Sequence, residues 1–147
     1  MDRAPAFRVV PECLLWAIAT VESNAGKLNV PKHEMAYCPG GYYYKKSPEV
    51  RELWKRWGDS AACSYSSFQI LYVVAIELGF GGSPIDLWYD EEACPLVVKF
   101  LNHRVIEKNP RNLQDIADAY NSGTHRDRHI PHDYIRKFLT AYNEVQL

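Results

Sequence analysis

One glutamate, Glu22, lies where an acid is unexpected in a helix predicted to end near Ser23. At about 100° per residue, Glu22 points about 80° away from Leu14, between the directions of Ile18 and Leu15. An acid that served only solubility would face the opposite side of the helix. Burial, and secondly the negative end of the helix dipole, would raise the pKa of this carboxyl group. A general acid needs such an environment.

The side chain of a single acid at a helix end could also bend into water, so the position of Glu22 alone does not establish a catalytic role. Two later segments provide further evidence. The first reads Ser-Tyr-Ser-Ser-Phe-Gln-Ile over residues 64–70, and the second reads Ala-Tyr-Asn-Ser-Gly over residues 119–123. A buried tyrosine hydroxyl such as that of Tyr120 needs a hydrogen-bond partner, and a desolvated carboxyl group can be that partner. The three segments together favour a catalytic interpretation.

In this order and at these distances, the segments resemble the motifs of the soluble lytic transglycosylase and goose-type lysozyme superfamily. That family has Glu-Ser at a helix end, a Gly-Leu-Met-Gln-Ile-like segment and Ala-Tyr-Asn-x-Gly. The resemblance extends over nearly the whole chain from Pro11. It includes residues 85–105, which connect the second motif to the third, and a closing helix near residues 134–138. It implies a mainly α, lysozyme-like single domain over residues 1–147.

The resemblance implies a role for each matching residue. Glu22 matches the catalytic acid, and Ser23 matches the residue that follows it and helps to orient the carboxyl group. Gln69 matches the glutamine on the cleft wall beside the sugar. Tyr120 and Asn121 match the third motif, in which the phenol is expected to hydrogen-bond the catalytic carboxyl group.

The second motif departs from the family pattern. Ser66-Ser67 occupies the place of Gly-Leu, so a backbone turn that favours glycine is expected to be shaped differently. Phe68 replaces the usual methionine, which exchanges one apolar wall for another. We expect Ser67 and Phe68 to bind or orient the substrate together with the matching residues above.

The connection between the first two motifs, residues 24–63, is long and rich in tyrosine. We expect it to form a lobe or a cleft rim, with a short β-hairpin around Tyr37–Tyr44, where Pro39-Gly40-Gly41 could turn. Tyrosine rings stack on sugars, so a non-catalytic glycan-binding module is an alternative function. The same tyrosines could instead pack a loop against the core.

The implied reaction cleaves the β-1,4 bond after N-acetylmuramic acid in peptidoglycan and forms a 1,6-anhydro ring. One carboxyl group acts first as acid and then as base, because the substrate's own acetamido group assists; no metal or organic cofactor is needed. A hydrolytic muramidase is the alternative, and it usually positions water with a second carboxylate. Candidates by position alone are Glu34, Asp59, Asp86 and Asp90.

Length and composition are those of an ordinary globular domain. The chain has 147 residues, of which 47% are hydrophobic and 24% are charged, and its net charge of −1 argues against a nucleic-acid partner. No apolar run reaches the roughly 18 residues of a membrane span, and the N-terminus does not follow the signal-peptide pattern. We expect a monomer that acts on the glycan strands of the bacterial cell wall.

Apolar periodicity and capping residues predict helices joined by loops. Six helices are expected: Pro11–Ser23, residues 48–57 between a Ser47 cap and Gly58, residues 68–78, residues 95–105, residues 113–120 after an Asn112 cap, and Asp133–Tyr142.

The four cysteines lack the C-x-x-C spacing of zinc knuckles and thioredoxin-like sites. They are Cys13, Cys38, Cys63 and Cys94. Four buried, reduced thiols, or a disulfide between Cys38 and Cys63 around the tyrosine-rich segment, are both compatible with the sequence.

Three histidines near the C-terminus, His125, His129 and His132, have a spacing that could suggest a metal site. Pro131 and the neighbouring charges favour a solvated loop, and we predict no metal there.

Overall fold

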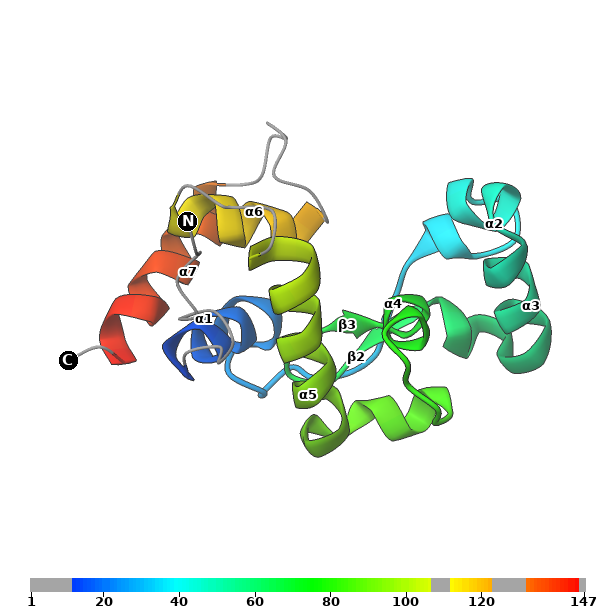
Figure 1. Cartoon of the computed structure of the whole chain (residues 1–147), viewed down its shortest axis with the longest axis horizontal. Coiled ribbons are helices and arrows are strands. Elements are labelled where there is room, and N and C mark those ends of the chain that lie inside the picture. The colour runs from blue at the N-terminus through cyan, green and yellow to red at the C-terminus, as the bar shows by residue number, and fades with distance from the viewer. Residues whose placement is uncertain (1–11, 107–111, 123–131, 146–147) are drawn as a thin grey trace, which may run out of the picture.

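The computed structural model describes residues 12–106, 112–122 and 132–145 as helices around one small antiparallel sheet (Figure 1). The predicted mainly α class is thereby confirmed. The α-helices are α1 (Glu12–Ser23), α2 (Tyr42–Lys46), α3 (Pro48–Trp57), α4 (Tyr72–Glu77), α5 (Asp90–Phe100), α6 (Leu113–Ser122) and α7 (His132–Val145). Three 3₁₀ turns, η2 (Met35–Tyr37), η3 (Gly58–Ala62) and η4 (Pro84–Trp88), and a π-helical turn, η5 (Leu101–Val105), complete the helical elements.

The sheet has the order β1-β2-β3 and joins segments distant in sequence. Its strands are β1 (Lys32–His33), β2 (Cys63–Tyr65) and β3 (Ile70–Leu71). Lys32 faces Ser64, and His33 faces Cys63, so β1 pairs with β2 across the long connection. β2 and β3 form the hairpin of the structure, around residues 66–69.

The hairpin predicted around Tyr37–Tyr44 is wrong, because this segment forms η2 and α2. Gly41 explains the difference. Its backbone packs against the carbonyl groups of Met35 and Ala36 so closely that a Cβ atom would overlap with them. The chain therefore folds back on η2, and no opposing strand forms.

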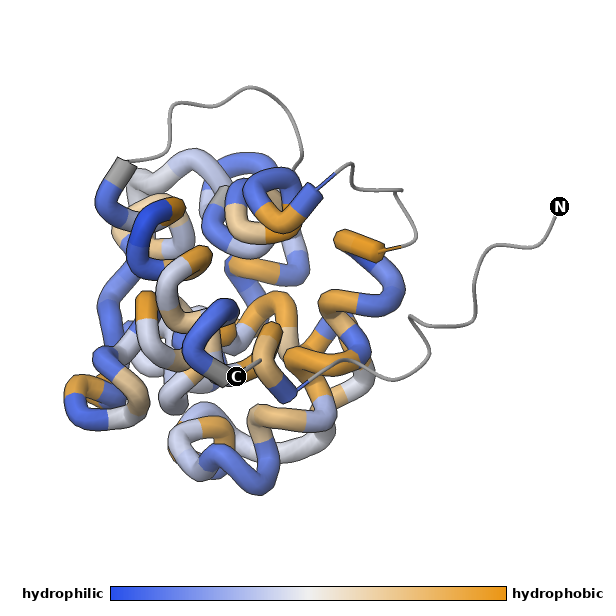
Figure 2. The backbone as a smooth tube through the Cα atoms, turned by 90° about the vertical axis from the view of Figure 1, so that its left-hand side faces the viewer, coloured by the Kyte–Doolittle hydropathy of each residue, from blue (hydrophilic) through white to orange (hydrophobic). Residues whose placement is uncertain are grey.

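Residues 32–62, comprising β1, η2, α2, α3 and η3, form what we call the small lobe; the other described residues form the large lobe (Figure 1). In the large lobe, α1 packs extensively against α7, and Ile18 and Phe138 are fully buried there. Hydrophobic stretches alternate with hydrophilic ones along the helices of this side (Figure 2). None of the described helices combines the length and apolar character that a membrane span needs.

Two predicted helix starts are confirmed by their caps. The hydroxyl of Ser47 accepts a hydrogen bond from the amide of Val50 at 3.3 Å, and Gly58, with φ +65°, ends α3. Asn112 Oδ1 accepts from the amide of Asp115 at 2.9 Å before α6. Short polar side chains satisfy free amides at helix starts, so sequence patterns detect such starts well.

Two other predicted starts are wrong. The helix expected from Phe68 begins at Tyr72, because residues 66–69 form the hairpin turn. The helix expected to start at Pro95 begins five residues earlier, at Asp90, and Pro95 lies inside it. Acidic residues at positions 90–92 favour the earlier start by complementing the helix dipole.

Candidate active site

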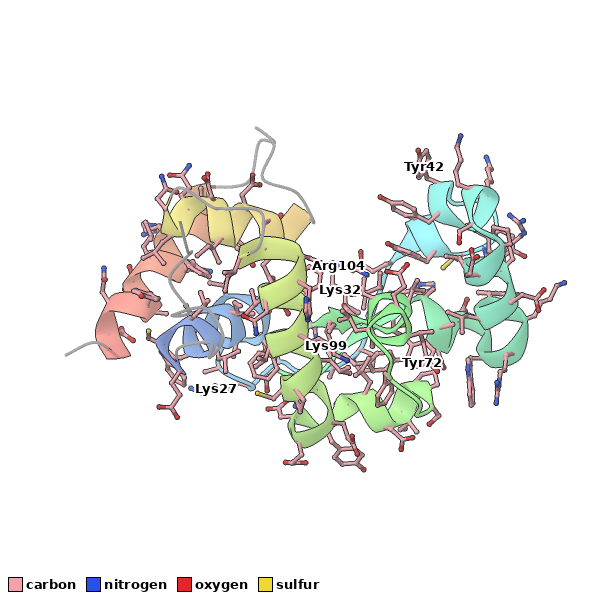
Figure 3. The ribbon with its side chains drawn as sticks, viewed as in Figure 1. Lys27, Lys32, Tyr42, Tyr72, Lys99 and Arg104 are labelled. Atoms are coloured by element: carbon pink, nitrogen blue, oxygen red, sulfur yellow. The ribbon has the colours of Figure 1, made fainter. Side chains whose placement is uncertain are left out.

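A cleft of 580 Å³ lies between the two lobes, and Glu22 is part of its lining. This volume is in the range of small-molecule and saccharide sites. The large lobe contributes Glu22, Gln69, Tyr120 and Asn121, among others, and the small lobe contributes Lys32, Glu34, Tyr37 and Tyr43. Figure 3 labels two basic lining residues, Lys32 of β1 and Arg104 of η5, near the middle of the molecule.

Glu22 is mostly buried at the end of α1, as its helical phase predicts. Its Oε2 accepts a hydrogen bond from the hydroxyl of Tyr134 on α7 at 2.6 Å. Desolvation raises the pKa of Glu22 from 4.5 to about 7, against the opposing effects of the Tyr134 hydrogen bond and the positive charge of Lys32. The carboxyl group can therefore hold or release a proton near neutral pH.

Ser23 anchors the end of α1. None of its hydrogen bonds with the described residues goes to the Glu22 carboxyl group. Its buried hydroxyl lies 2.6 Å from the carbonyl oxygen of Ser67 and accepts from the amide of Gly26 at 2.9 Å. It also lies 3.0 Å from the carbonyl oxygen of Ala19. The predicted orienting role is thus corrected: Ser23 holds the helix end against the second motif.

The turn at residues 66–69 has the conformation that favours glycine. Ser66 has φ +74° and Gln69 has φ +50°, both in the left-handed region, which costs about 1 kcal/mol for a residue with a side chain. Ser66 thus adopts a glycine-type conformation, whereas a differently shaped turn was expected from serine at this position. The buried Ser66 hydroxyl supports the turn by accepting from the amide of Phe68 at 3.2 Å.

Ser67 and Phe68 were expected beside the substrate, but the structure buries both outside the cleft lining. The amide and hydroxyl of Ser67 donate to the two carboxylate oxygens of Asp90, at 2.9 and 2.6 Å. Phe68 is part of the hydrophobic core. These residues support the cleft wall and do not form its surface.

Gln69 lies in the cleft wall, as expected, with its amide group held in place. Its Nε2 lies 2.9 Å from the carbonyl oxygen of Ser66 and 3.2 Å from that of Val30, and its Oε1 accepts from the hydroxyl of Ser64 at 3.2 Å. Asn121 lines the same cleft and is exposed at the end of α6. Its side chain is accessible to a ligand.

Tyr120 was expected to hydrogen-bond Glu22, and this expectation is wrong. Its hydroxyl donates to the carbonyl oxygen of Phe68 at 2.7 Å. The ring packs edge-on against Phe100, with centroids 5.5 Å apart. Glu22 is nevertheless close, because its charge, together with burial, raises the pKa of Tyr120.

Tyr134 occupies the role expected of Tyr120. It belongs to the segment whose likeness to the family's closing helix is noted above, but its pairing with Glu22 was missed. The available signal is its position: Tyr134, Phe138 and Ala141 recur at helical spacing on one face of α7, and Phe138 and Ala141 are buried. A tyrosine on such a face needs a polar partner for its hydroxyl.

Of the four candidate second carboxylates, Glu34 is the one in the lining of this cleft. Its charge raises the pKa of Glu22, and its Oε2 lies 3.9 Å from Lys32 Nζ. Asp86 accepts from the amide and hydroxyl of Ser83, and Asp90 holds the second motif as described. Asp59 lines a different pocket.

Comparisons with protein-family models, with curated proteins and with solved structures find no match to this chain. The resemblance therefore rests on the motif residues themselves. His125 and His129, the weak metal pattern, lie outside the described residues, and so does the side chain of His132.

Proposed function

We propose that this protein is a peptidoglycan lytic transglycosylase in which Glu22 is the general acid and base. The observation that carries the proposal is the partly buried Glu22 carboxyl group in the cleft, with the Tyr134 hydroxyl 2.6 Å from it and a pKa raised to about 7 by desolvation. A carboxyl group poised near neutrality can both donate and accept a proton within one catalytic cycle. The order of the three motifs supports the same assignment.

The first step needs a protonated Glu22. Tyr134 donates to Oε2, so the acidic proton is available on the other carboxyl oxygen, Oε1. Glu22 gives this proton to the glycosidic oxygen as the bond to the anomeric carbon breaks. The 2-acetamido oxygen of the N-acetylmuramic acid residue forms a bond to that carbon, which relieves the positive charge.

The second step uses the Glu22 carboxylate left by the first. It removes the proton from the 6-hydroxyl group of the same sugar, whose oxygen then displaces the acetamido oxygen. The 1,6-anhydro ring closes, Glu22 is again protonated, and no water is consumed. The Tyr134 hydrogen bond and the positive charge of Lys32 stabilise the intervening carboxylate.

The small-lobe side of the cleft supplies groups suited to a glycan. Tyr37 and Tyr43 line it, with their rings stacked at a centroid distance of 4.7 Å. Aromatic faces stack on the apolar faces of sugars, and the carboxylate–ammonium pair of Glu34 and Lys32 offers hydrogen-bonding groups. The substrate strand would lie between this side and Glu22.

A hydrolytic muramidase is the second candidate, and the position of Glu34 is the observation that favours it. Glu34 lines the same cleft as Glu22, so it could act as a base that activates water. In that reaction, a water molecule attacks the anomeric carbon and the product carries a free reducing end.

The deciding experiment digests purified peptidoglycan with the wild-type protein and measures product masses. Anhydro-muropeptides, one water lighter than hydrolysed fragments, would support the transglycosylase, whereas hydrated products would support the muramidase. We expect Glu22→Gln to lower the cleavage rate by about 10³-fold, because Gln has no proton to transfer. Glu77→Gln, an equal change at another lining residue, is the matched control and should retain activity.

The Glu34→Gln variant further distinguishes a transglycosylase activity from a muramidase activity. A transglycosylase keeps most of its rate in this variant, while a muramidase that uses Glu34 as base loses it. If neither the wild type nor the Glu34→Gln variant cleaves, and Glu22→Gln binds glycan strands as well as wild type, the protein is a glycan-binding module and the proposal fails.

A further inference from the structure

A second cluster of reactive side chains lies in the small lobe, outside the lining of the active-site cleft. Within the described part of the chain, His33, Cys38 and Asp59 bring one nitrogen, one sulfur and one carboxylate oxygen within 4.8 Å of one another. They come from three elements: β1, the residue that follows η2, and η3. All four cysteines of the chain are free thiols.

The distances within this cluster match the edges of a tetrahedral metal site. Cys38 Sγ lies 3.0 Å from His33 Nε2, and that nitrogen lies 3.6 Å from Asp59 Oδ1. With usual zinc–ligand lengths, two ligand atoms of a tetrahedral Zn²⁺ are about 3.3 to 3.8 Å apart. A zinc ion therefore requires only a small movement of these atoms.

Cys63 is a candidate fourth ligand whose sulfur lies outside the 4.8 Å cluster and must move toward the ion. It faces His33 directly across the β1–β2 pair, so the two side chains lie on the same face of the sheet. His33, Asp59 and Cys63 all line one open pocket of 320 Å³, which provides a path for an ion from solvent. The Cys63 thiol also lies 3.4 Å from the carbonyl oxygen of Asp59.

The small lobe has a structural need for such a site. Its buried hydrophobic residues are four: Cys38, Val50, Ala61 and Ala62. Three of them, Cys38, Val50 and Ala62, lie outside the main core cluster. Lobes with so little buried apolar surface commonly depend on a metal ion or a disulfide for stability.

We propose that the small lobe, together with Cys63 of the adjoining strand β2, binds one Zn²⁺ ion through His33 Nε2, Cys38 Sγ, the Asp59 carboxylate and Cys63 Sγ. The two thiols release their protons to solvent on binding, and the imidazole binds in its neutral form. The ion ties β1, η2, β2 and η3 together and thus fixes the small-lobe side of the cleft. This inference does not depend on the proposed enzymatic function.

The test uses the full-length, reduced, metal-free protein and adds Zn²⁺ or Co²⁺ alone. We expect one equivalent of Zn²⁺ to bind by calorimetry and to raise the melting temperature. Co²⁺ at the same site should give the intense visible absorption of tetrahedral coordination and the near-ultraviolet absorption of cobalt–thiolate bonds. Adding a chelator should reverse both effects.

Single substitutions test which residues bind the ion. Cys38→Ser should lower the cobalt–thiolate absorption by about half, because the Cys63 thiolate remains, and lower Zn²⁺ affinity at least tenfold. His33→Ala should also weaken binding, and because its side chain is 42% exposed, the lobe should still fold. Cys94→Ser, a change at a half-buried thiol on α5, is the matched control and should bind as wild type.

Three outcomes would overturn the proposal. The first is the absence of saturable binding in the reduced wild-type protein. The second is unchanged binding in both Cys38→Ser and His33→Ala. The third is loss of binding in His129→Ala but not in His33→Ala, which would place the ion in the C-terminal histidine segment.

Discussion

The two sides of the cleft differ in how they are supported. Glu22 lies on the large-lobe side, where α1, α6 and α7 pack around fully buried residues such as Ile18 and Phe138. The small-lobe side has few buried residues and exposes large rings, with Tyr42 at 62% and Tyr43 at 45% exposure. One side is a packed core with a carboxyl group at its edge, and the other is a thin layer with polar and aromatic groups.

This difference shows how packing alone can prepare a carboxyl group for proton transfer. The dense side removes much of the water around Glu22, and this desolvation is the main cause of its raised pKa. Glu34 on the opposite side lies in a more exposed layer and makes a long, 3.9 Å contact with Lys32. Glu22 and Glu34, two acids in one cleft, are therefore suited to different chemical roles.

The largest expected effect tests the difference in packing. Phe138→Ala should lower the free energy of unfolding by about 4 kcal/mol, because it leaves a cavity between α7 and the core. Val50→Ala in the small lobe should cost about 2 kcal/mol, since less apolar surface is lost. Urea denaturation of both variants measures the contrast, and equal costs would contradict it.

The second prediction concerns the cost of keeping Glu22 buried. Below pH 4.5, both the folded and the unfolded chain carry the proton, so the Glu22 site imposes no penalty. Between pH 4.5 and about 7 the unfolded chain releases this proton while the folded chain keeps it, so stability falls across this window and is level above it. The shift from 4.5 to about 7 corresponds to about 3 kcal/mol.

Glu22→Gln removes this pH dependence. The variant should be about 2 to 3 kcal/mol more stable than wild type at pH 8.5 and equally stable at pH 4, as measured by denaturation. Glu34→Gln, on the exposed side, should change stability by less than about 0.5 kcal/mol at either pH. A Glu22→Gln variant without a gain at high pH would mean that the carboxyl group is solvated.

The third prediction separates the two tyrosines near Glu22. Tyr134→Phe removes the hydrogen bond that lowers the pKa of Glu22, so the high-pH limb of the cleavage profile should move to higher pH. We expect the rate to fall about tenfold, because the carboxylate loses a charge-assisted partner. Rate measurements between pH 5 and 9 provide the test.

Tyr120→Phe is the matched change. It should leave that limb in place and lower stability by about 1 kcal/mol, because the Phe68 carbonyl group loses its donor. If Tyr120→Phe moved the limb and Tyr134→Phe did not, the predicted pairing from the motif would be right and the observed one wrong.

The sequence predicted well what depends on neighbouring residues. The Ser47 cap and the helical phase of Glu22 follow from local spacing, and both agree with the structure. Such features need no knowledge of which segments meet.

Features that depend on long-range contacts were missed or misassigned. Tyr134 lies 112 residues from Glu22, and the choice between it and Tyr120 depends on how α7 crosses α1. The His33–Cys38–Asp59 cluster forms because β1 pairs with β2, and two-residue strands leave no readable alternation. Sequence patterns predict neither the Tyr134–Glu22 contact nor the His33–Cys38–Asp59 cluster, because both depend on which distant segments pack together.

The last prediction concerns the exposed side of the cleft. Tyr43 stacks on Tyr37, and aromatic pairs of this kind contribute about 1 kcal/mol. Tyr43→Ala should therefore change the free energy of unfolding by about 1 kcal/mol or less.

If the ring of Tyr43 also stacks on a sugar, the Tyr43→Ala variant should raise KM several-fold and leave the pH profile of kcat unchanged. Tyr42→Ala is the control on the same helix, since Tyr42 is exposed but does not line the cleft. Equal KM values for the two variants would show that the substrate does not use this side, and the glycan would then be held by the large lobe alone.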